Sequence, residues 1–525
     1  MRLDRASGIL AHPSSFPGPH GVGDIGAGAY QFIDWLTLGG QRFWQIMPLS
    51  PVGYGDSPYS ALSAFAGNPL FISLEGLGFL NLDVPADSRE FNDFEADYAA
   101  ASAHKFAALR QAFESFEERG SSELRRQLSE FETAQASWLR DFAFFMALKE
   151  RFQGVSWQDW PDEIRTRNPT ALERIAAEEA DAIEFHAFVQ FLFRLQWSAL
   201  KRYANERGIR IIGDIPIYVA LDSADVWANP KEFRLLPNGR PEVVSGVPPD
   251  LFTKDGQLWG NPVFDWQAME EDGFAWWIER VRRLTELVDV VRIDHFRGLA
   301  AGWVVPAGDA TARGGRWERA PGFNLFKAIE AALGHVPIVV EDLGIITPDV
   351  VELRKQVGLQ GMNVLQFAFD GNPDNAYLPH NYASDCVVYT GTHDNQTTIG
   401  WFQSCNEIER QQVQTYIGAD GSDIAWDFIR LAFGSVADLA IIPLQDVMRL
   451  GDEARMNRPG VAFGNWKWRY LAHQLHDGLA RGLRELAGAY GRLDRPAIEQ
   501  GYDPFDYSAP DTAHPLYDRH DPRDV

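Results

Sequence analysis

The chain has 525 residues, with 48 basic and 73 acidic side chains and a formal net charge of −25. A field of that sign repels nucleic-acid phosphates and anionic lipid surfaces, so composition argues against both as partners and favours a neutral or cationic ligand. Two cysteines without a CxxC pair exclude a disulfide framework and a structural zinc site. No signal-peptide core or stretch of eighteen apolar residues occurs, so we expect a cytoplasmic chain without a membrane span.

Eight short apolar runs recur along the chain, and several end in an acidic residue. They cover residues 8–12, 42–49, 209–214, 288–294, 337–341, 363–369, 386–390 and 439–444. Helix-like stretches separate the runs, which predicts parallel strands joined by crossover helices. Eight such units close into an α/β barrel, the (β/α)8 TIM fold, whose active site lies at the carboxyl ends of the strands.

Two stretches interrupt this rhythm. Residues 85–200 carry Phe, Leu and Ala at helical spacing and predict a helical insertion subdomain between barrel parts 1–84 and 201–490. Residues 225–275 are rich in Pro, Gly, Asn and Trp and predict long loops over the barrel mouth rather than a folding unit. Residues 491–525 form an acidic polar tail without periodicity.

Arg292 and Asp294 end the fourth apolar run, two residues apart, so their side chains lie on one face of the strand. A guanidinium beside a carboxylate lowers the carboxyl pKa and keeps the group ionised, as a nucleophile requires. A buried structural ion pair accounts for this motif equally well.

Glu341 and Asp342 end the fifth run and point to opposite faces, so only one of them enters the mouth. A carboxyl group in a partly apolar mouth has a raised pKa and can act as a general acid. The structural alternative is a helix cap by Asp342 or Thr347, and it explains Asp342 better than Glu341.

The seventh run ends in His393, Asp394 and Asn395, which we interpret as a clamp for sugar hydroxyls. A histidine alone is more often structural. Asp214, at the end of the third run, is a further acid that would orient its neighbours.

Acids from separate strand ends admit two chemistries, a retaining glycoside transfer and a divalent metal site. Metal sites usually have denser acidic sets or HxH pairs, which the sequence lacks. Loops with Tyr, Trp and side-chain amides, at 53–59 and 256–266, favour a neutral polyhydroxyl ligand, although rigid cover is the alternative. The 17 tryptophans fit sugar stacking or the filling of a large core.

Ordered motifs from about residue 6 to residue 485 are similar to those of one known family. They are Tyr54-Gly-Asp-Ser-Pro-Tyr59, Gly213-Asp-Ile-Pro-Ile217, Gly246-Val-Pro-Pro-Asp250, Trp259-Gly-Asn-Pro262, Arg292-Ile-Asp-His-Phe-Arg-Gly298, Glu341-Asp-Leu-Gly344, Thr392-His-Asp-Asn395 and Asn465-Trp-Lys-Trp-Arg469. Each motif is weak alone, but the full set in this order is specific. The chain resembles the 4-α-glucanotransferases, or amylomaltases, of glycoside hydrolase family 77.

The resemblance implies transfer of α-1,4-glucan segments between maltooligosaccharides with retained configuration, and no metal or organic cofactor. It implies Asp294 as the nucleophile, Glu341 as the general acid/base and Asp394 as the third acid. The side chains implied to bind substrate are Tyr54, Tyr59, Asp214, Asp250, Gln257, Trp259, Arg292, His295, His393 and Asn465. Leu251 stands where the family often has Tyr, so the resemblance does not extend to a stacking contact there.

Two other functions use the same residues. An α-glucan hydrolase would work with the same carboxylates, and a non-catalytic glucan-binding protein would keep the barrel alone. The presence of all three acids favours the transferase. The sequence does not predict the oligomeric state.

Overall fold

A ring of eight parallel strands forms the centre of the molecule, in the order β10-β11-β12-β1-β2-β3-β6-β9. The computed structural model describes residues 3–84, 90–249, 253–344 and 346–493. The barrel strands are β1 (Ala6–Leu10), β2 (Phe43–Gln45), β3 (Arg210–Ile215), β6 (Val290–Ile293), β9 (Ile338–Val340), β10 (Gly361–Val364), β11 (Cys386–Tyr389) and β12 (Leu439–Pro443). A parallel bridge between Val339 and Gln360 joins β9 to the segment just before β10 and closes the ring. The predicted TIM barrel is therefore confirmed.

Each of the eight apolar runs overlaps one barrel strand, although the run 363–369 begins two residues after the start of β10 and extends well beyond its end. One buried cluster draws side chains from all eight strands, which places it inside the ring. Its members include Phe43, Ile212, Val290, Val339 and Leu439. Because side chains alternate along a strand, this inward set also decides which later residues of each strand face the mouth.

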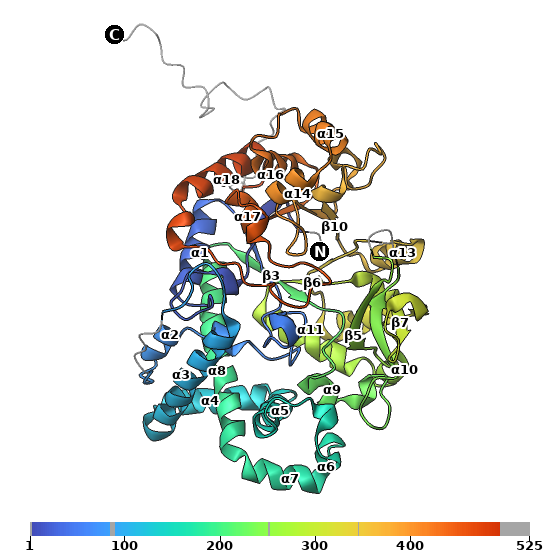
Figure 1. Cartoon of the computed structure of the whole chain (residues 1–525). Helices are drawn as coiled ribbons and strands as arrows, with labels where there is room; N and C mark the ends of the chain where they lie inside the picture. Colours follow the sequence, from blue (N-terminus) through green and yellow to red (C-terminus); the bar gives the residue numbers. More distant parts are fainter. Residues whose placement is uncertain (1–2, 85–89, 250–252, 345, 494–525) are drawn as a thin grey trace, which may run out of the picture.

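Helices surround the barrel and also form a separate group at one end of the molecule (Figure 1). They are α1 (Ala27–Leu38), α2 (Leu74–Gly78), α3 (Tyr98–Arg119), α4 (Ser122–Ala134), α5 (Leu139–Arg151), α6 (Asp162–Arg165), α7 (Pro169–Glu178), α8 (Ala180–Glu206), α9 (Ala224–Ala228), α10 (Trp266–Glu271), α11 (Ala275–Leu287), α12 (Gly322–Leu333), α13 (Pro348–Val357), α14 (Thr398–Ser404), α15 (Glu407–Ile417), α16 (Ile424–Gly434), α17 (Leu444–Val447) and α18 (Asp477–Ala489). Local chemistry sets such bounds: α13 begins at Pro348 and is capped after Val357 by Gly358, which lies in the left-handed region with φ of 69°.

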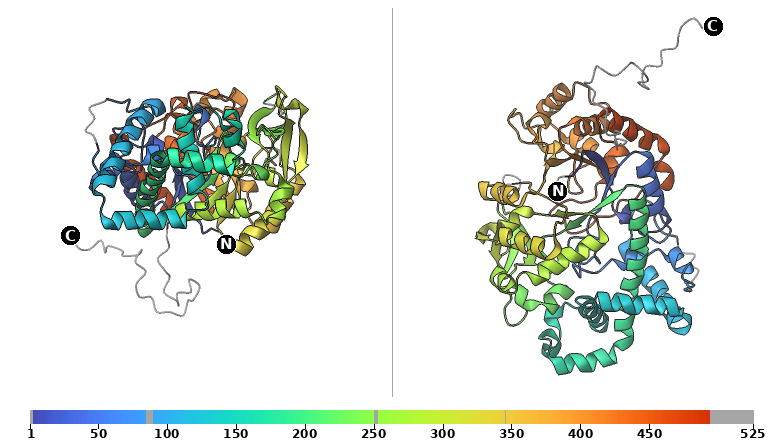
Figure 2. Two further views of the ribbon diagram at one scale, coloured as in Figure 1. Left: turned by 90° about the horizontal axis from the view of Figure 1, so that it is seen from below. Right: turned by 180° about the vertical axis from the view of Figure 1, so that it is seen from behind.

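The helices α4 to α7 lie at the opposite end of the molecule from α14, α15 and α18, in front and back views alike (Figure 2). They belong to the long connection between β2 and β3, where the sequence predicts a helical insertion. Helix α8 continues from this group and ends just before β3. The description of residues 85–200 as a subdomain of their own stays a prediction.

A second sheet, of four antiparallel strands, stands beside the barrel. Its strands are β4 (Val243–Val247), β5 (Gln257–Pro262), β7 (Ala301–Pro306) and β8 (Arg316–Arg319). The expectation of loops alone over 225–275 was wrong in this respect, because β4 and β5 lie within that stretch. Gly246 interrupts the alternation of β4, and Gly260 and Pro262 interrupt that of β5. Pairing of β4 with β5 and with the later strand β7 stabilises them.

Ten of the 17 tryptophans are buried, so this residue mainly fills the core. Trp259 and Trp317 are the most exposed, each at 38%. Among the described residues, no helix has the length and apolar character needed to cross a bilayer. The predicted tail falls almost wholly on residues 494–525, outside the described ranges.

Candidate active site

Strand alternation brings the predicted acids to one end of the barrel. Val290 lies inside the ring, so Arg292 and then Asp294 follow on the same inward side. By the same alternation Asp214 follows Ile212 on β3, and Glu341 follows Val339 on β9. These side chains meet at the carboxyl end of the barrel, as the sequence predicts.

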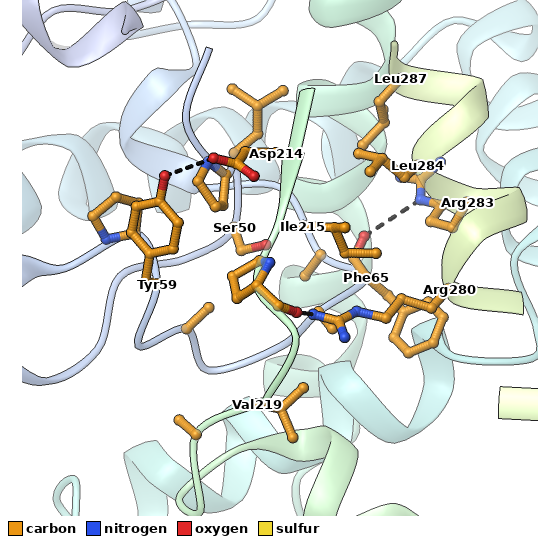
Figure 3. A pocket seen from close by; sticks show the side chains of 18 of the residues that line it. Ser50, Tyr59, Phe65, Asp214, Ile215, Val219, Arg280, Arg283, Leu284 and Leu287 are labelled. Atoms are coloured by element: carbon orange, nitrogen blue, oxygen red, sulfur yellow. Dashed lines mark hydrogen bonds between the residues drawn. The ribbon is translucent and has the colours of Figure 1, made fainter. Parts of the chain in front are cut away.

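Arg292 is the centre of the site. Its guanidinium is buried and donates both to Asp214 and, at 3.1 Å, to Asp294. The Tyr59 hydroxyl donates to the same Asp214 oxygen as Arg292, Oδ2, at 2.8 Å (Figure 3). Burial alone would lower the pKa of Arg292, but Asp214 and Asp294 hold it well above its usual value. The cation is therefore permanent and orients the Asp294 carboxylate.

Glu341, and not Asp342, faces the mouth. Two backbone N–H groups, of His295 and Leu343, donate to its carboxyl oxygens at 2.7 Å each. His295 adopts a positive φ of 50°, an uncommon conformation for a non-glycine residue. Asp342 lies between strands instead, where it accepts from the Met362 N–H at 2.8 Å. The helix-cap alternative was wrong for Asp342, since its partners belong to β10 and to α13.

Asp394 follows β11 and is held from a different segment of the chain. The Asn457 amide donates to its carboxylate at 2.7 Å, and Arg455 donates to its backbone carbonyl at 2.8 Å. Its neighbour His393 stacks on the Tyr59 ring, with centroids 5.1 Å apart and planes 10° from parallel. Tyr59 therefore contacts both the Asp214 side and the Asp394 side of the mouth.

The two acids of the β6 and β9 ends differ in protonation at neutral pH. Burial, followed by the charge of Asp294, raises the pKa of Glu341 to about 8. Burial raises the pKa of Asp294 to about 6, with Arg292 opposing and Asp214 and Asp394 adding to the shift, so the lowered pKa expected from the sequence was wrong because burial outweighs the neighbouring cation. Near pH 7 Glu341 thus carries a proton while Asp294 is mainly ionised, which is the division of roles that an acid and a nucleophile need.

The acids remain open to a ligand. The side chains of Asp294 and Asp394 are 28% and 46% exposed, whereas Arg292 and Asp214 beneath them are almost fully buried. Burial also lowers the pKa of His295 to about 4, so that this imidazole is neutral. The mouth therefore presents carboxyl groups and neutral rings to the substrate.

The predicted groove residues divide into two groups. Trp259 packs edge-on against the His295 ring, with centroids 4.7 Å apart, and its indole N–H donates to Gln257. These residues of β5 therefore join the acids at the mouth.

Tyr54 and Asn465 lie farther along the loops. Tyr54 is 69% exposed and contacts the Phe463 ring, with centroids 5.2 Å apart. Asn465 is buried, and its amide bonds the backbone of Arg458 and Val461. Its amide thus holds the 458–465 loop together. Asp250 and Leu251 lie outside the described residues.

Sequence reasoning missed the side chains that hold Asp394 and a buried histidine that interacts with His393. Asn457 and Arg455 lie in a loop after β12 without periodicity or a motif, so no local signal marks them. His12 follows β1 inside the predicted first run, and burial, assisted by His393, lowers its pKa to about 3. The position of His12 just after the carboxyl end of a strand was the signal that could have identified it as a site residue. Among the described residues no group of three or more His, Cys, Asp or Glu side chains is arranged to hold a metal ion.

Residues 11–474 match the family described as 4-alpha-glucanotransferase. The chain belongs to this family. A 4-alpha-glucanotransferase from Thermus thermophilus is 48% identical over 504 residues, covering 94% of this chain and all of that one. One from Synechocystis is 49% identical over 495 residues, covering 93% and 98%.

The solved structures agree with the family. An amylomaltase from Streptococcus agalactiae, in complex with acarbose, superposes with a TM-score of 0.88 at 36% identity, covering 93% of this chain and all of that one. The amylomaltase from Corynebacterium glutamicum, at 20% identity, shares the fold with a TM-score of 0.72, covering 93% and 75%. The family resemblance drawn from the motifs is thus confirmed.

Proposed function

We propose that this chain moves α-1,4-glucan segments from a donor to an acceptor maltooligosaccharide, with retention of the anomeric configuration, and that Asp294, Glu341 and Asp394 perform the chemistry. The observation that carries the proposal is the pairing, at one barrel mouth, of a carboxyl group protonated at neutral pH with an ionised carboxylate held by Arg292.

In the first step Glu341 donates its proton to the glycosidic oxygen while Asp294 attacks the anomeric carbon. The C–O bond of the glycoside breaks, the shortened glucan leaves as an alcohol, and a covalent glucosyl ester forms on Asp294. Glu341 then removes the proton of an incoming sugar 4-hydroxyl. That oxygen displaces Asp294, and the second inversion restores the α configuration.

Asp394 and the buried cluster beneath the acids orient the sugar. The Asn457 amide fixes one carboxylate oxygen of Asp394 and leaves the other side of the group for sugar hydroxyls. Trp259, Gln257 and Tyr54 supply the aromatic and amide surfaces along which further glucose units lie. Transfer exceeds hydrolysis when the acceptor sugar occupies the mouth and excludes water.

Incubation of the purified protein with maltotriose alone tests the reaction. Glucose together with a ladder of longer maltooligosaccharides, at a constant number of reducing ends, is the expected result. Rising reducing ends without a ladder would instead establish the hydrolase, and unchanged maltotriose would leave a binding protein. Asp294→Asn should abolish the ladder while glucan binding persists, and substantial turnover by this variant would refute the role of Asp294.

A further inference from the structure

A cavity of about 40 Å³ lies against the contact between Tyr59 and Asp214 (Figure 3). Tyr59 and Asp214 lie on one side of it, and Arg280 and Arg283 of helix α11 on the other. No role in the chemistry above involves this cavity or the two arginines. Both belong to the outer helical layer of the barrel.

Arg280 and Arg283 are each only 2% exposed, which is unusual for side chains of an outer helix. Burial lowers the pKa of Arg280 to about 9 and that of Arg283 to about 10. Removing two guanidinium groups from water is costly unless their hydrogen bonds are met within the protein. Their bonding partners therefore indicate what the arrangement stabilises.

Arg280 donates to the carbonyl oxygens of Pro216 and Ile217, at 2.5 and 3.2 Å. These two residues directly follow Asp214 and Ile215 at the end of β3. Arg280 therefore fixes the backbone just beyond the carboxylate that holds Arg292.

Arg283 pairs with Glu286 of its own helix at 2.8 Å and also donates to the Phe65 carbonyl at 3.3 Å, in the loop after β2 that carries Tyr59. The Gln190 side chain bonds the adjacent Gly67 backbone twice, and Asp225 accepts from the Ala64 N–H. Three outer helices thus hold one end of the Tyr59 loop. Among the described residues, the Tyr59 hydroxyl donates its hydrogen bond to Asp214.

Three atoms of these side chains are buried without a hydrogen-bond partner among the described residues: Asp214 Oδ1, Arg280 Nε and Arg283 Nη2. One acceptor and two donors thus belong to residues that line the same cavity. A metal ion would be repelled by the two guanidinium groups, and a small anion by the Asp214 carboxylate. Water satisfies both kinds of atom, and a volume of about 40 Å³ exceeds the 10–15 Å³ that one molecule needs.

We propose that Arg280 and Arg283 are positioning residues of the sugar site, which act on Tyr59 and Asp214 through the two loops and through ordered water in this cavity. This inference rests on the proposed glucan transfer. Tyr59 donates to Asp214, Asp214 holds Arg292, and Arg292 orients the nucleophile Asp294. A displacement in the outer layer therefore reaches the reacting carboxylate without any contact between α11 and the sugar.

The test compares Arg283→Met and Arg280→Met with a matched control on the same helix, Arg282→Met. The Arg282 side chain is 47% exposed, and its ion-pair partner within the described part of the chain is Glu279 of the same helix. Maltotriose disproportionation should lose about 10- to 100-fold in kcat in the first two variants, because a misplacement of the nucleophile of this kind slows the chemical step. KM should change less than threefold, and the control should match the wild type in both constants.

Arg283→Lys distinguishes positioning from simple loss of stability. A lysine keeps one donor and the charge, so it should recover part of kcat, with all assays performed well below each variant's Tm. A folded Arg283→Met enzyme with wild-type kcat would overturn the inference.

A variant that keeps both arginines covers the case in which Arg283→Met does not fold. Ala66 lines the cavity and is buried, so Ala66→Val would displace the water while leaving every guanidinium bond possible. A fall in kcat supports the inference, and an unchanged kcat overturns it. A high-resolution crystal structure should contain a water molecule hydrogen-bonded to Asp214 Oδ1. A cavity without water would refute the proposal that ordered water connects these side chains. Absence of transfer in the wild type would refute the proposed function instead, so the two failures are distinguishable.

Discussion

The protonated state of Glu341 depends on the charge of Asp294, and removing that charge is a direct test of the site. In Asp294→Asn the side chain keeps its shape but loses its negative charge, which is the second cause of the raised pKa of Glu341. We therefore expect the pKa of Glu341 to fall below its value of about 8 in this variant.

The size of the shift follows from the charge separation. Carboxyl groups of retaining glycoside enzymes lie about 5 Å apart, and two unit charges at that distance interact by about 3 kcal/mol at an effective dielectric constant of 20. This corresponds to about two pKa units. Asp294 is 28% exposed, and the water that reaches it weakens the interaction, so a fall of about one to two units is expected.

Difference infrared spectroscopy of the carboxyl band, from about pH 4 to pH 10, measures the titration. Subtracting the spectrum of the double variant Asp294→Asn/Glu341→Gln from that of Asp294→Asn assigns the carboxyl band to Glu341. Asp374→Asn removes an exposed carboxylate from the loop after β10 and serves as a control that should leave the band unshifted. If the pKa of Glu341 were the same in Asp294→Asn as in the wild type, the two carboxyl groups would not interact. The assignment of acid and nucleophile from this geometry would then fail.

Three further outcomes are expected. The pKa values of Asp294, about 6, and of Glu341, about 8, predict a bell-shaped pH profile of kcat/KM with its maximum near pH 7 and a fall of about tenfold at pH 5 and at pH 9. A flat profile over that range would contradict the acid–base assignment. Asn457→Ala frees the Asp394 carboxylate and should lower kcat about tenfold in the maltotriose assay, whereas an unaltered kcat would mean that the amide is not needed to orient Asp394. Arg492→Met should lower the free energy of unfolding by about 2–4 kcal/mol, because this buried guanidinium donates to carbonyl groups of β1 and of the segment after α16. Denaturant titration measures this loss. The control variant Arg484→Met, at an exposed position, should unfold with a free energy within about 0.5 kcal/mol of the wild type.

The barrel was predictable from the sequence because each of its strands is a short, locally apolar run. Exposing such a run to water is unfavourable, and its β-branched residues favour a strand conformation wherever in the sequence the neighbouring strands lie. The motifs around Asp294 and Glu341 were recognisable for a related reason, since each follows a strand directly and period-two alternation fixes its face, whereas Asp394 lies in the loop after β11.

The second sheet could not be predicted in the same way. β4 contains Gly246, and β5 contains Gly260 and Pro262 and is only partly buried, so neither has a local preference strong enough to identify it. β5 pairs with β4, and β4 pairs with the distant strand β7; such pairing between distant segments leaves no periodic signal in the chain.

The choice between Glu341 and Asp342 shows the same limit within the site. The sequence determined that one of two adjacent carboxyl groups enters the mouth, because neighbouring side chains of a strand point to opposite faces. Only the closed barrel decided which, since Val339 packs inside the ring and carries Glu341 to the same side. The protonation of Glu341, the support of Asp394 by Asn457 and the burial of Arg280 and Arg283 likewise arise from segments far apart in the chain. Charge interaction and burial depend on distance in space, and the order of residues alone does not contain that distance.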